Sequence, residues 1–267
     1  MAHGETLLPD ERSPSAIEGV PVARPALLAC QSARRCRWAP TQPPMRAGCW
    51  VARWGTAKLL AYILVLRPWQ LRWGATAAEQ QDALPGDELL GHADLSATRA
   101  LTVRAPTGVV WPWVAQQGQG RGGFYSYDLL ENLVGCDIHS ATQVIPALQH
   151  LDVGDKIRLA PEVALEVAAV DPGRALILRG AVQMGRIAPP YDFTWAFVLR
   201  PEDGCTRFLV RERYAYKKRW APLLVEPVAV VSFVMSQKML RGIRARAERQ
   251  FAAGHDEGGR PGPARPA

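Results

Sequence analysis

A carboxylate and an imidazole stand two residues apart in the segment CDIHS, as Asp137 and His139. A histidine beside an aspartate can move protons as a general acid or base, as a dehydration or cyclisation requires. No nucleophile in a recognisable motif accompanies the pair, so a hydrogen bond within a loop is the favoured interpretation. Asp137 and His139 are therefore candidate catalytic residues.

A second candidate is Glu212, in the segment TRFLVRERYAY. Because side chains alternate along a strand, one face carries an apolar and aromatic set together with this carboxylate: Phe208, Val210, Glu212, Tyr214 and Tyr216. If that face lines a cavity, Glu212 is a candidate acid, base or ligand-orienting group. The favoured alternative is an ion pair with a strand arginine such as Arg179 or Arg200.

The stretch GQGRGGFYSYDLLENLVG, residues 118–135, has the glycines of a phosphate-binding loop. A dinucleotide-binding loop follows a strand and opens a helix, however, and these glycines follow a helical segment. No G-K-[ST] motif of a P-loop is present. We interpret the stretch as a tight helix–loop–helix joint in which glycines permit positive φ, and we expect no cofactor.

The elements that position these residues follow from periodicity and breaker residues. A helix from Thr56 to Leu66 is expected to end at Arg67-Pro68, and Thr76 with Glu79 forms a capping-box pattern. The first strand is expected at 97–105 and two small helices follow it. Five further strands alternate with turns, and one long helix then runs from Pro227 to about Phe251.

This order predicts one domain at 96–251, preceded by a helical lead-in at 49–95. Residues 1–48 are rich in Pro, Ala and Arg and are expected to be a disordered extension, unless Met45 is the true start. Residues 252–267 are expected to be a disordered tail. The fold class is α+β, with a curved antiparallel sheet wrapped around the long C-terminal helix and a cavity between them.

The composition is that of a globular protein with a net charge of +7. The basic excess lies largely outside the candidate core, which is typical of a solvated face, so we expect no nucleic-acid partner. The five cysteines form no C-x-x-C pair, and we expect reduced thiols, no bound metal and a cytoplasmic protein. The run Leu59–Leu66 is too short to cross a bilayer but is a candidate for weak membrane-surface contact. Packing against the domain is its favoured alternative.

The segment ATRALTVRAPTGVVWPWVAQQGQ, a strand that enters an aromatic helix through Ala-Pro, resembles the SRPBCC superfamily. This group includes the START and polyketide cyclase/dehydrase proteins and has the helix-grip fold. RGGFYSYDLLENLVGCDIHSA, PPYDFTWAFVLRP and RERYAY are similar to a bacterial branch of it. The resemblance covers about residues 96–249 and implies a deep hydrophobic cavity, with no shared set of catalytic residues.

We therefore expect the protein to bind a small hydrophobic ligand, lipid- or polyketide-like, without catalysis. One alternative is a cyclase or dehydratase that uses Asp137, His139 or Glu212, and another is a lipid handler at a membrane surface. The oligomeric state stays open. The residues expected to contact the ligand come from the joint, two strands and the long helix: Tyr125, Tyr127, Trp195, Phe197, Glu212, Tyr214, Met235 and Met239.

Overall fold

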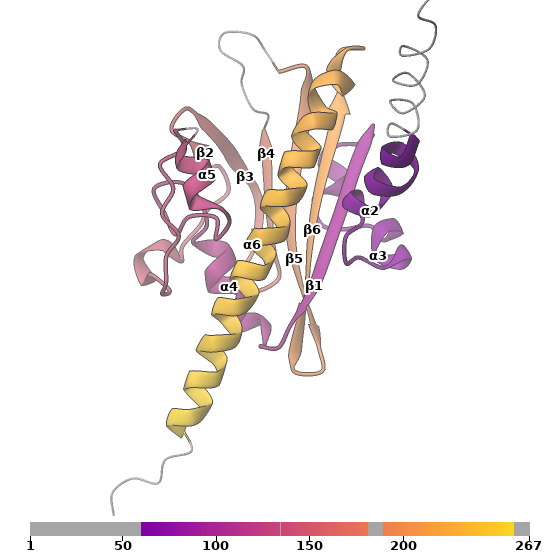
Figure 1. Ribbon diagram of the computed structural model, residues 1–267. Helices are drawn as coiled ribbons and strands as arrows, with labels where there is room; N and C mark the ends of the chain where they lie inside the picture. Colours follow the sequence, from indigo (N-terminus) through magenta and orange to yellow (C-terminus); the bar gives the residue numbers. More distant parts are fainter. Residues whose placement is uncertain (1–59, 134, 181–188, 259–267) are drawn as a thin grey trace, which may run out of the picture. The chain divides into compact units, whose positions relative to one another are not determined.

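A computed structural model of the protein describes residues 60–133, 135–180 and 189–258 (Figure 1). The segment 1–48 lies outside the described residues, as do 49–59 of the expected lead-in and the end of the expected tail, 259–267. The described part of the lead-in and the sheet domain lie in one compact unit.

Six antiparallel strands form one sheet in the order β1-β6-β5-β4-β3-β2. Sequential hairpins connect β2 to β3, β3 to β4 and β5 to β6, as expected from the alternating segments and the turn residues between them. The strands are β1 (Leu95–Val103), β2 (Lys156–Ala160), β3 (Val163–Asp171), β4 (Ala175–Gly180), β5 (Tyr191–Glu202) and β6 (Cys205–Tyr216).

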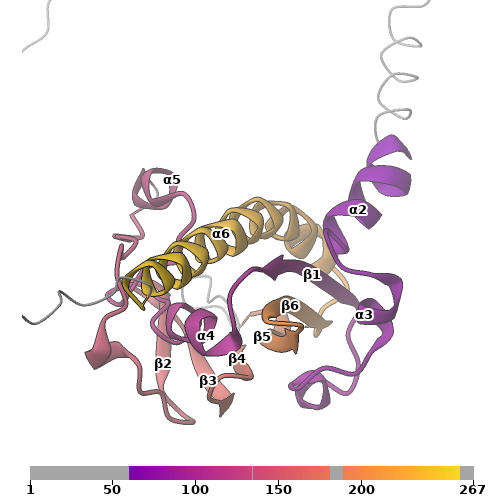
Figure 2. The same cartoon turned by 90° about the horizontal axis from the view of Figure 1, so that it is seen from below.

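The long helix α6 (Ala221–Gly258) runs across one face of the curved sheet (Figures 1 and 2). At 38 residues it is about 57 Å long, starting before and ending after the predicted 227–251. Its buried side chains recur every three or four residues, and the face they form packs against the sheet: Val225, Ala229, Phe233, Ser236, Leu240, Ile243 and Ala247. This is the helix-grip arrangement, and the predicted fold class is confirmed.

The helix α6 is also long and apolar enough, by composition, to cross a membrane. A core helix passes the same test, because it too must be apolar on the side that it buries. The row of buried α6 side chains faces the sheet, so we describe α6 as the core helix of this domain.

Two small helices, α4 (Thr107–Ala115) and α5 (Asp128–Leu133), follow β1 as predicted. The glycine loop between them closes on itself, since Gly118 and Gly123 exchange two backbone hydrogen bonds. Gly123 has φ +72°, and a Cβ there would lie 2.8 Å from the His139 carbonyl oxygen. The loop is thus a backbone joint, which explains its glycines without a phosphate.

The lead-in wraps around the β1 edge of the sheet: its first helices contact α6, through Trp69 with Phe233 and Arg67 with Glu226, and the residues from Ala75 onward cover the opposite face. Its helical segments are η1 (Tyr62–Leu66), α2 (Arg67–Leu71), α3 (Ala77–Gln81) and η2 (Asp87–Leu89). The predicted helix end at Arg67-Pro68 is wrong: the chain stays helical to Leu71, because Pro68 lies in the first turn of α2, where a missing N–H breaks no hydrogen bond. The capping box of Thr76 and Glu79 is confirmed.

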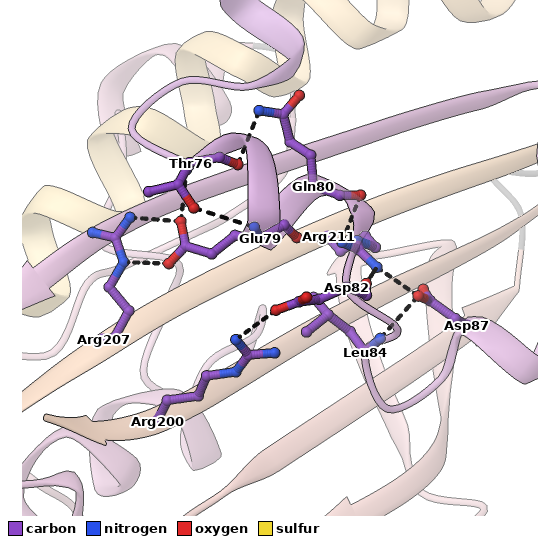
Figure 3. Close-up of polar contacts among 9 residues, drawn as sticks. All are labelled: Thr76, Glu79, Gln80, Asp82, Leu84, Asp87, Arg200, Arg207 and Arg211. Carbon is purple, nitrogen blue, oxygen red and sulfur yellow. Dashed lines mark hydrogen bonds and ion pairs between the residues drawn. The ribbon is translucent and has the colours of Figure 1, made fainter.

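Arginines of β6 attach this lead-in to the sheet (Figure 3). Arg207 donates to both carboxylate oxygens of Glu79, at 2.6 and 2.8 Å. Arg211 donates to Asp87 at 2.5 Å and to the Glu79 carbonyl at 2.7 Å. Both arginines occupy the face of β6 opposite Glu212, so alternation along one strand assigns one face to the lead-in and the other to α6.

Candidate ligand cavity

A cavity of ≈ 260 Å³ lies where α6 passes over β5 and β6. Its wall is formed by side chains from the joint, from α5 and the loop after it, from β2, β5 and β6, and from α6. Most of these side chains are apolar or aromatic. The lining residues are Phe124, Ser126, Glu131, Cys136, Ile138, Leu159, Tyr191, Phe193, Trp195, Glu212, Tyr214, Val228, Val231, Ser232, Met235, Ser236 and Met239.

The aromatic side of the cavity is set by the register of β5 and β6. Phe193 pairs with Tyr214 and Trp195 pairs with Glu212 across the two strands. Directly opposed residues share a face, and the Phe193 and Tyr214 rings lie 4.7 Å apart. Burial raises the pKa of the Tyr214 hydroxyl well above its ordinary value, and the nearby Glu212 carboxylate raises it further, so this hydroxyl stays protonated.

The helix α6 supplies the other side of the cavity. Val228, Val231 and Met235 lie beside the row of α6 side chains that packs on the sheet. Val228 and Met235 are half-buried and Val231 is exposed, and all three line the cavity. The cavity therefore exists where the helix presents apolar side chains that the curved sheet does not reach.

Glu212, which lines the cavity, forms a buried ion pair with a residue behind the cavity wall. Arg99 of β1 is 0% exposed and donates through Nη1 to Oε1 of Glu212, at 2.6 Å. Ser232 and Ser236 of α6 donate to the same oxygen at 2.6 and 3.0 Å. Arg99 Nε also donates to the Gln70 carbonyl, so the lead-in contributes to the pair. The expected alternative partners were wrong, because Arg179 binds Glu166 and Arg200 binds Asp82 at the surface.

A second buried carboxylate, Glu131 of α5, also lines the cavity. It is 7% exposed, and Ser126 donates to its Oε1. Burial raises the pKa of Glu131, and the Asp128 charge raises it further, while the Ser126 hydrogen bond lowers it. The protonated form is thus more accessible here than at the surface.

Five of the residues expected to contact a ligand line the cavity: Trp195, Glu212, Tyr214, Met235 and Met239. Tyr125, Tyr127 and Phe197 are not in its wall. Tyr125 is buried under Arg246 and accepts a hydrogen bond from Gln116, burial raises its pKa to about 12, and it fixes the joint. Tyr127 is exposed and lies under Lys238, whereas Phe197 is packed in the core.

The candidate dyad lies outside the cavity wall. Asp137 Oδ1 and His139 Nε2 are 3.3 Å apart, and their side chains are 75% and 83% exposed. They form the loop contact that the sequence favoured over a catalytic pair.

Sequence reasoning missed Arg99 and the two serines. The sequence did indicate Arg99, since alternation along β1 places it with Leu101 and Val103 on the apolar face. Ser232 and Ser236 stand four residues apart, which places them on one side of a helix. Glu131 was expected near the mouth of the cavity with the tyrosines of the joint, and it lines the cavity wall.

No group of three or more metal-binding side chains is found among the described residues. Cys136 and Cys205, the two cysteines in that part of the chain, are free thiols. Burial raises the pKa of Cys136, which disfavours its thiolate.

Protein-family models and curated proteins gave no match to the chain. Solved structures similar to it include protein Ms6760 from Mycobacterium smegmatis, with 19% identity, 57% of this chain and 89% of that chain covered, and a TM-score of 0.37. The ZhuI aromatase/cyclase from Streptomyces sp. R1128 has 16% identity, 60% and 98% coverage and a TM-score of 0.35. Ara h 8.0201 has 17% identity, 57% and 97% coverage and a TM-score of 0.37. The fold assignment itself rests on the strand order and on α6.

Proposed function

We propose that the protein binds a small, largely apolar molecule in the cavity between β5, β6 and α6. The observation that carries the proposal is a wall of aromatic and aliphatic side chains around ≈ 260 Å³. An engineered apolar cavity of about 150 Å³ holds one benzene ring. The space here therefore suits a ligand of about two fused rings, or a short acyl chain of similar bulk.

A matched pair of valine variants tests this proposal. Val228 lines the cavity from α6, whereas the exposed Val234, on the same helix, does not. We expect 2-naphthol to bind the full chain in calorimetric titration. V228F, which fills the cavity, should weaken binding at least about tenfold, and V234F should leave it unchanged. Equal binding by both variants, or no binding by the unmodified protein, would contradict the proposal.

A cyclase or dehydratase is the enzymatic alternative, and one observation favours it: two buried carboxylates, Glu131 and Glu212, line one apolar cavity. Asp137 and His139 would have no part in such a reaction. The probe is 4-hydroxy-4-phenylbutan-2-one, from which a base removes the C3 proton as water leaves from C4, forming the conjugated enone. Acceleration that E131Q or E212Q abolishes would support the alternative, and the uncatalysed rate in the presence of protein would oppose it.

A membrane-surface role is the second alternative. The segment 60–66 is not packed against the domain as favoured from sequence, since Leu60 and Ile63–Leu66 are exposed, with Leu64 at 69%. The double variant L64S/V65S should reduce flotation with vesicles of phosphatidylcholine and phosphatidylglycerol. The control is L129S/L133S, which removes two leucines of α5 that are even more exposed, at 83% and 82%. Flotation that is equal in both variants, or absent in the unmodified chain, would oppose this role.

A further inference from the structure

We infer that the cavity selects an uncharged apolar molecule with two hydroxyl groups, one bound by Glu212 and the other by Glu131. The inference rests on the proposed function and adds the polar chemistry of the ligand. It follows from buried hydrogen-bonding atoms that the protein itself leaves without partners.

The first of these atoms is Glu212 Oε2. Glu212 is 1% exposed, and Arg99, Ser232 and Ser236 all donate to its other oxygen, Oε1. Oε2 is buried and has no partner at hydrogen-bonding distance among the described residues, and the same holds for Nη2 of Arg99; the neighbouring Tyr214 hydroxyl also interacts with this carboxyl group. An arginine–carboxylate pair built for stability is commonly bidentate, with two parallel hydrogen bonds. Here the pair uses one oxygen and leaves the other unpartnered in a residue that lines the cavity.

The second atom is Glu131 Oε2. It too is buried without a partner, while Ser126 donates to Oε1. Glu131 comes from α5 and Glu212 from β6, so the two acceptors stand on different elements around one cavity. An unsatisfied buried polar atom costs about 1–3 kcal/mol, and two in one apolar wall indicate groups that a ligand completes.

The indole Nε1 of Trp195 adds a donor. It is buried and unpartnered, and Trp195 lies directly opposite Glu212 in the β5–β6 register. A hydroxyl group both donates and accepts. One ligand hydroxyl between Glu212 and Trp195 can therefore donate a hydrogen bond to the carboxylate and accept one from the indole.

The charged groups in and behind the cavity wall disfavour a ligand that itself carries a charge. A ligand carboxylate would lie beside the carboxyl groups of Glu131 and Glu212. An ammonium group would lose its hydration without gaining a free counter-charge, because Arg99 already neutralises Glu212 and burial favours the protonated form of Glu131 by raising its pKa. A hydroxyl supplies the missing donor without a net charge. Two hydroxyls on a skeleton of about two rings match both the acceptors and the volume.

The experiment compares four probes of one shape by calorimetric titration of the full chain: naphthalene, 2-methoxynaphthalene, 2-naphthol and 2,6-dihydroxynaphthalene. Hydrogen bonds to charged groups predict that 2-naphthol binds about tenfold or more tightly than its methyl ether, which has no donor. The diol should bind more tightly than 2-naphthol by a similar factor. Each hydroxyl also makes the probe more water-soluble, so a preference for it cannot arise from apolar transfer.

Two test variants, E131M and R99M/E212L, show which carboxyl group binds each hydroxyl of the probe. E131M should remove the advantage of the diol over 2-naphthol, whereas E162M, at an exposed loop position, should not. Because Glu212 and Arg99 depend on each other, the partner test is the double variant R99M/E212L, which should bind 2-naphthol and its ether equally.

Equal affinity for all four probes would overturn the inference and leave the proposed function standing. The inference would also be overturned if E131M still bound the diol more tightly than 2-naphthol and R99M/E212L still bound 2-naphthol more tightly than its methyl ether. Binding of none of the probes would overturn the proposed function itself.

Discussion

The buried Arg99–Glu212 pair is expected to lower the stability of the ligand-free fold relative to an apolar replacement. The two side chains are 0% and 1% exposed, and one contact of 2.6 Å joins them while each keeps an unpartnered atom. Removing one partner leaves a buried charge uncompensated and costs about 3–5 kcal/mol. The single variants R99M and E212L should each lower the free energy of unfolding by that amount. This is a large share of the roughly 5–15 kcal/mol by which a domain is stable.

The double variant R99M/E212L should recover nearly all of this loss, because replacing a buried pair by apolar side chains is neutral or stabilising by about 1–4 kcal/mol. The assay is equilibrium unfolding in urea, followed by circular dichroism without added ligand, for the unmodified chain and the three variants. If the double variant stays as destabilised as either single variant, the pair contributes net stability and the reasoning from its unpartnered atoms is refuted; losses that simply add would show no coupling between the two side chains and would refute it as well.

Two further pairs of variants test the elements that surround the cavity. The hydrogen bond from Arg207 of β6 lowers the pKa of Glu79 to about 2. The ionised Glu79 therefore adds at most about 3 kcal/mol to the free energy of unfolding. This stabilisation is present above pH 4.5 and is lost as the pH falls towards 2. In urea titrations at several pH values, the stability of E79Q should lack this acid-sensitive contribution. D82N removes a carboxylate from the exposed Arg200–Asp82 ion pair and should keep it. Identical dependence of stability on pH in the two variants would contradict the role given to Glu79. A Cβ on Gly242 would lie 2.3 Å from the Tyr125 carbonyl oxygen, whereas Gly254 faces open space. Thermal unfolding should therefore show G242A destabilised by about 1–3 kcal/mol and G254A unchanged or slightly stabilised, and equal effects would argue against close packing of α6 on the joint.

Local patterns were sufficient to predict the architecture. Period-two alternation and turn residues predicted the strands after residue 155 because successive side chains of a strand point to opposite faces of the sheet. The glycines of the joint could be interpreted because their place after a helix excluded a nucleotide loop. Helix ends were less accurate: apolar positions at helical spacing predicted 227–251, whereas α6 begins earlier, where Ala221 and Val225 are buried, and continues past 251 as an exposed helix.

The site could be predicted in part. Trp195, Tyr214 and Met239 were expected in the cavity wall because they stand on the apolar faces of β5, β6 and α6. The partner of Glu212 could not be chosen correctly, because several strand arginines were available and pairing depends on which strands become neighbours. Glu131 was expected at the mouth of the cavity, but its burial could not be predicted, because it depends on how α5 docks, which the sequence of α5 does not encode.

The most direct measurement of the central claim is a set of nuclear Overhauser contacts between 2-naphthol and the methionine methyl groups of the full chain. Met235 and Met239 line the cavity from α6. Binding inside it predicts cross-peaks from the naphthol ring protons to both of these methyls, and their loss in V228F. Saturable binding of naphthol without contacts to either methyl would contradict the account.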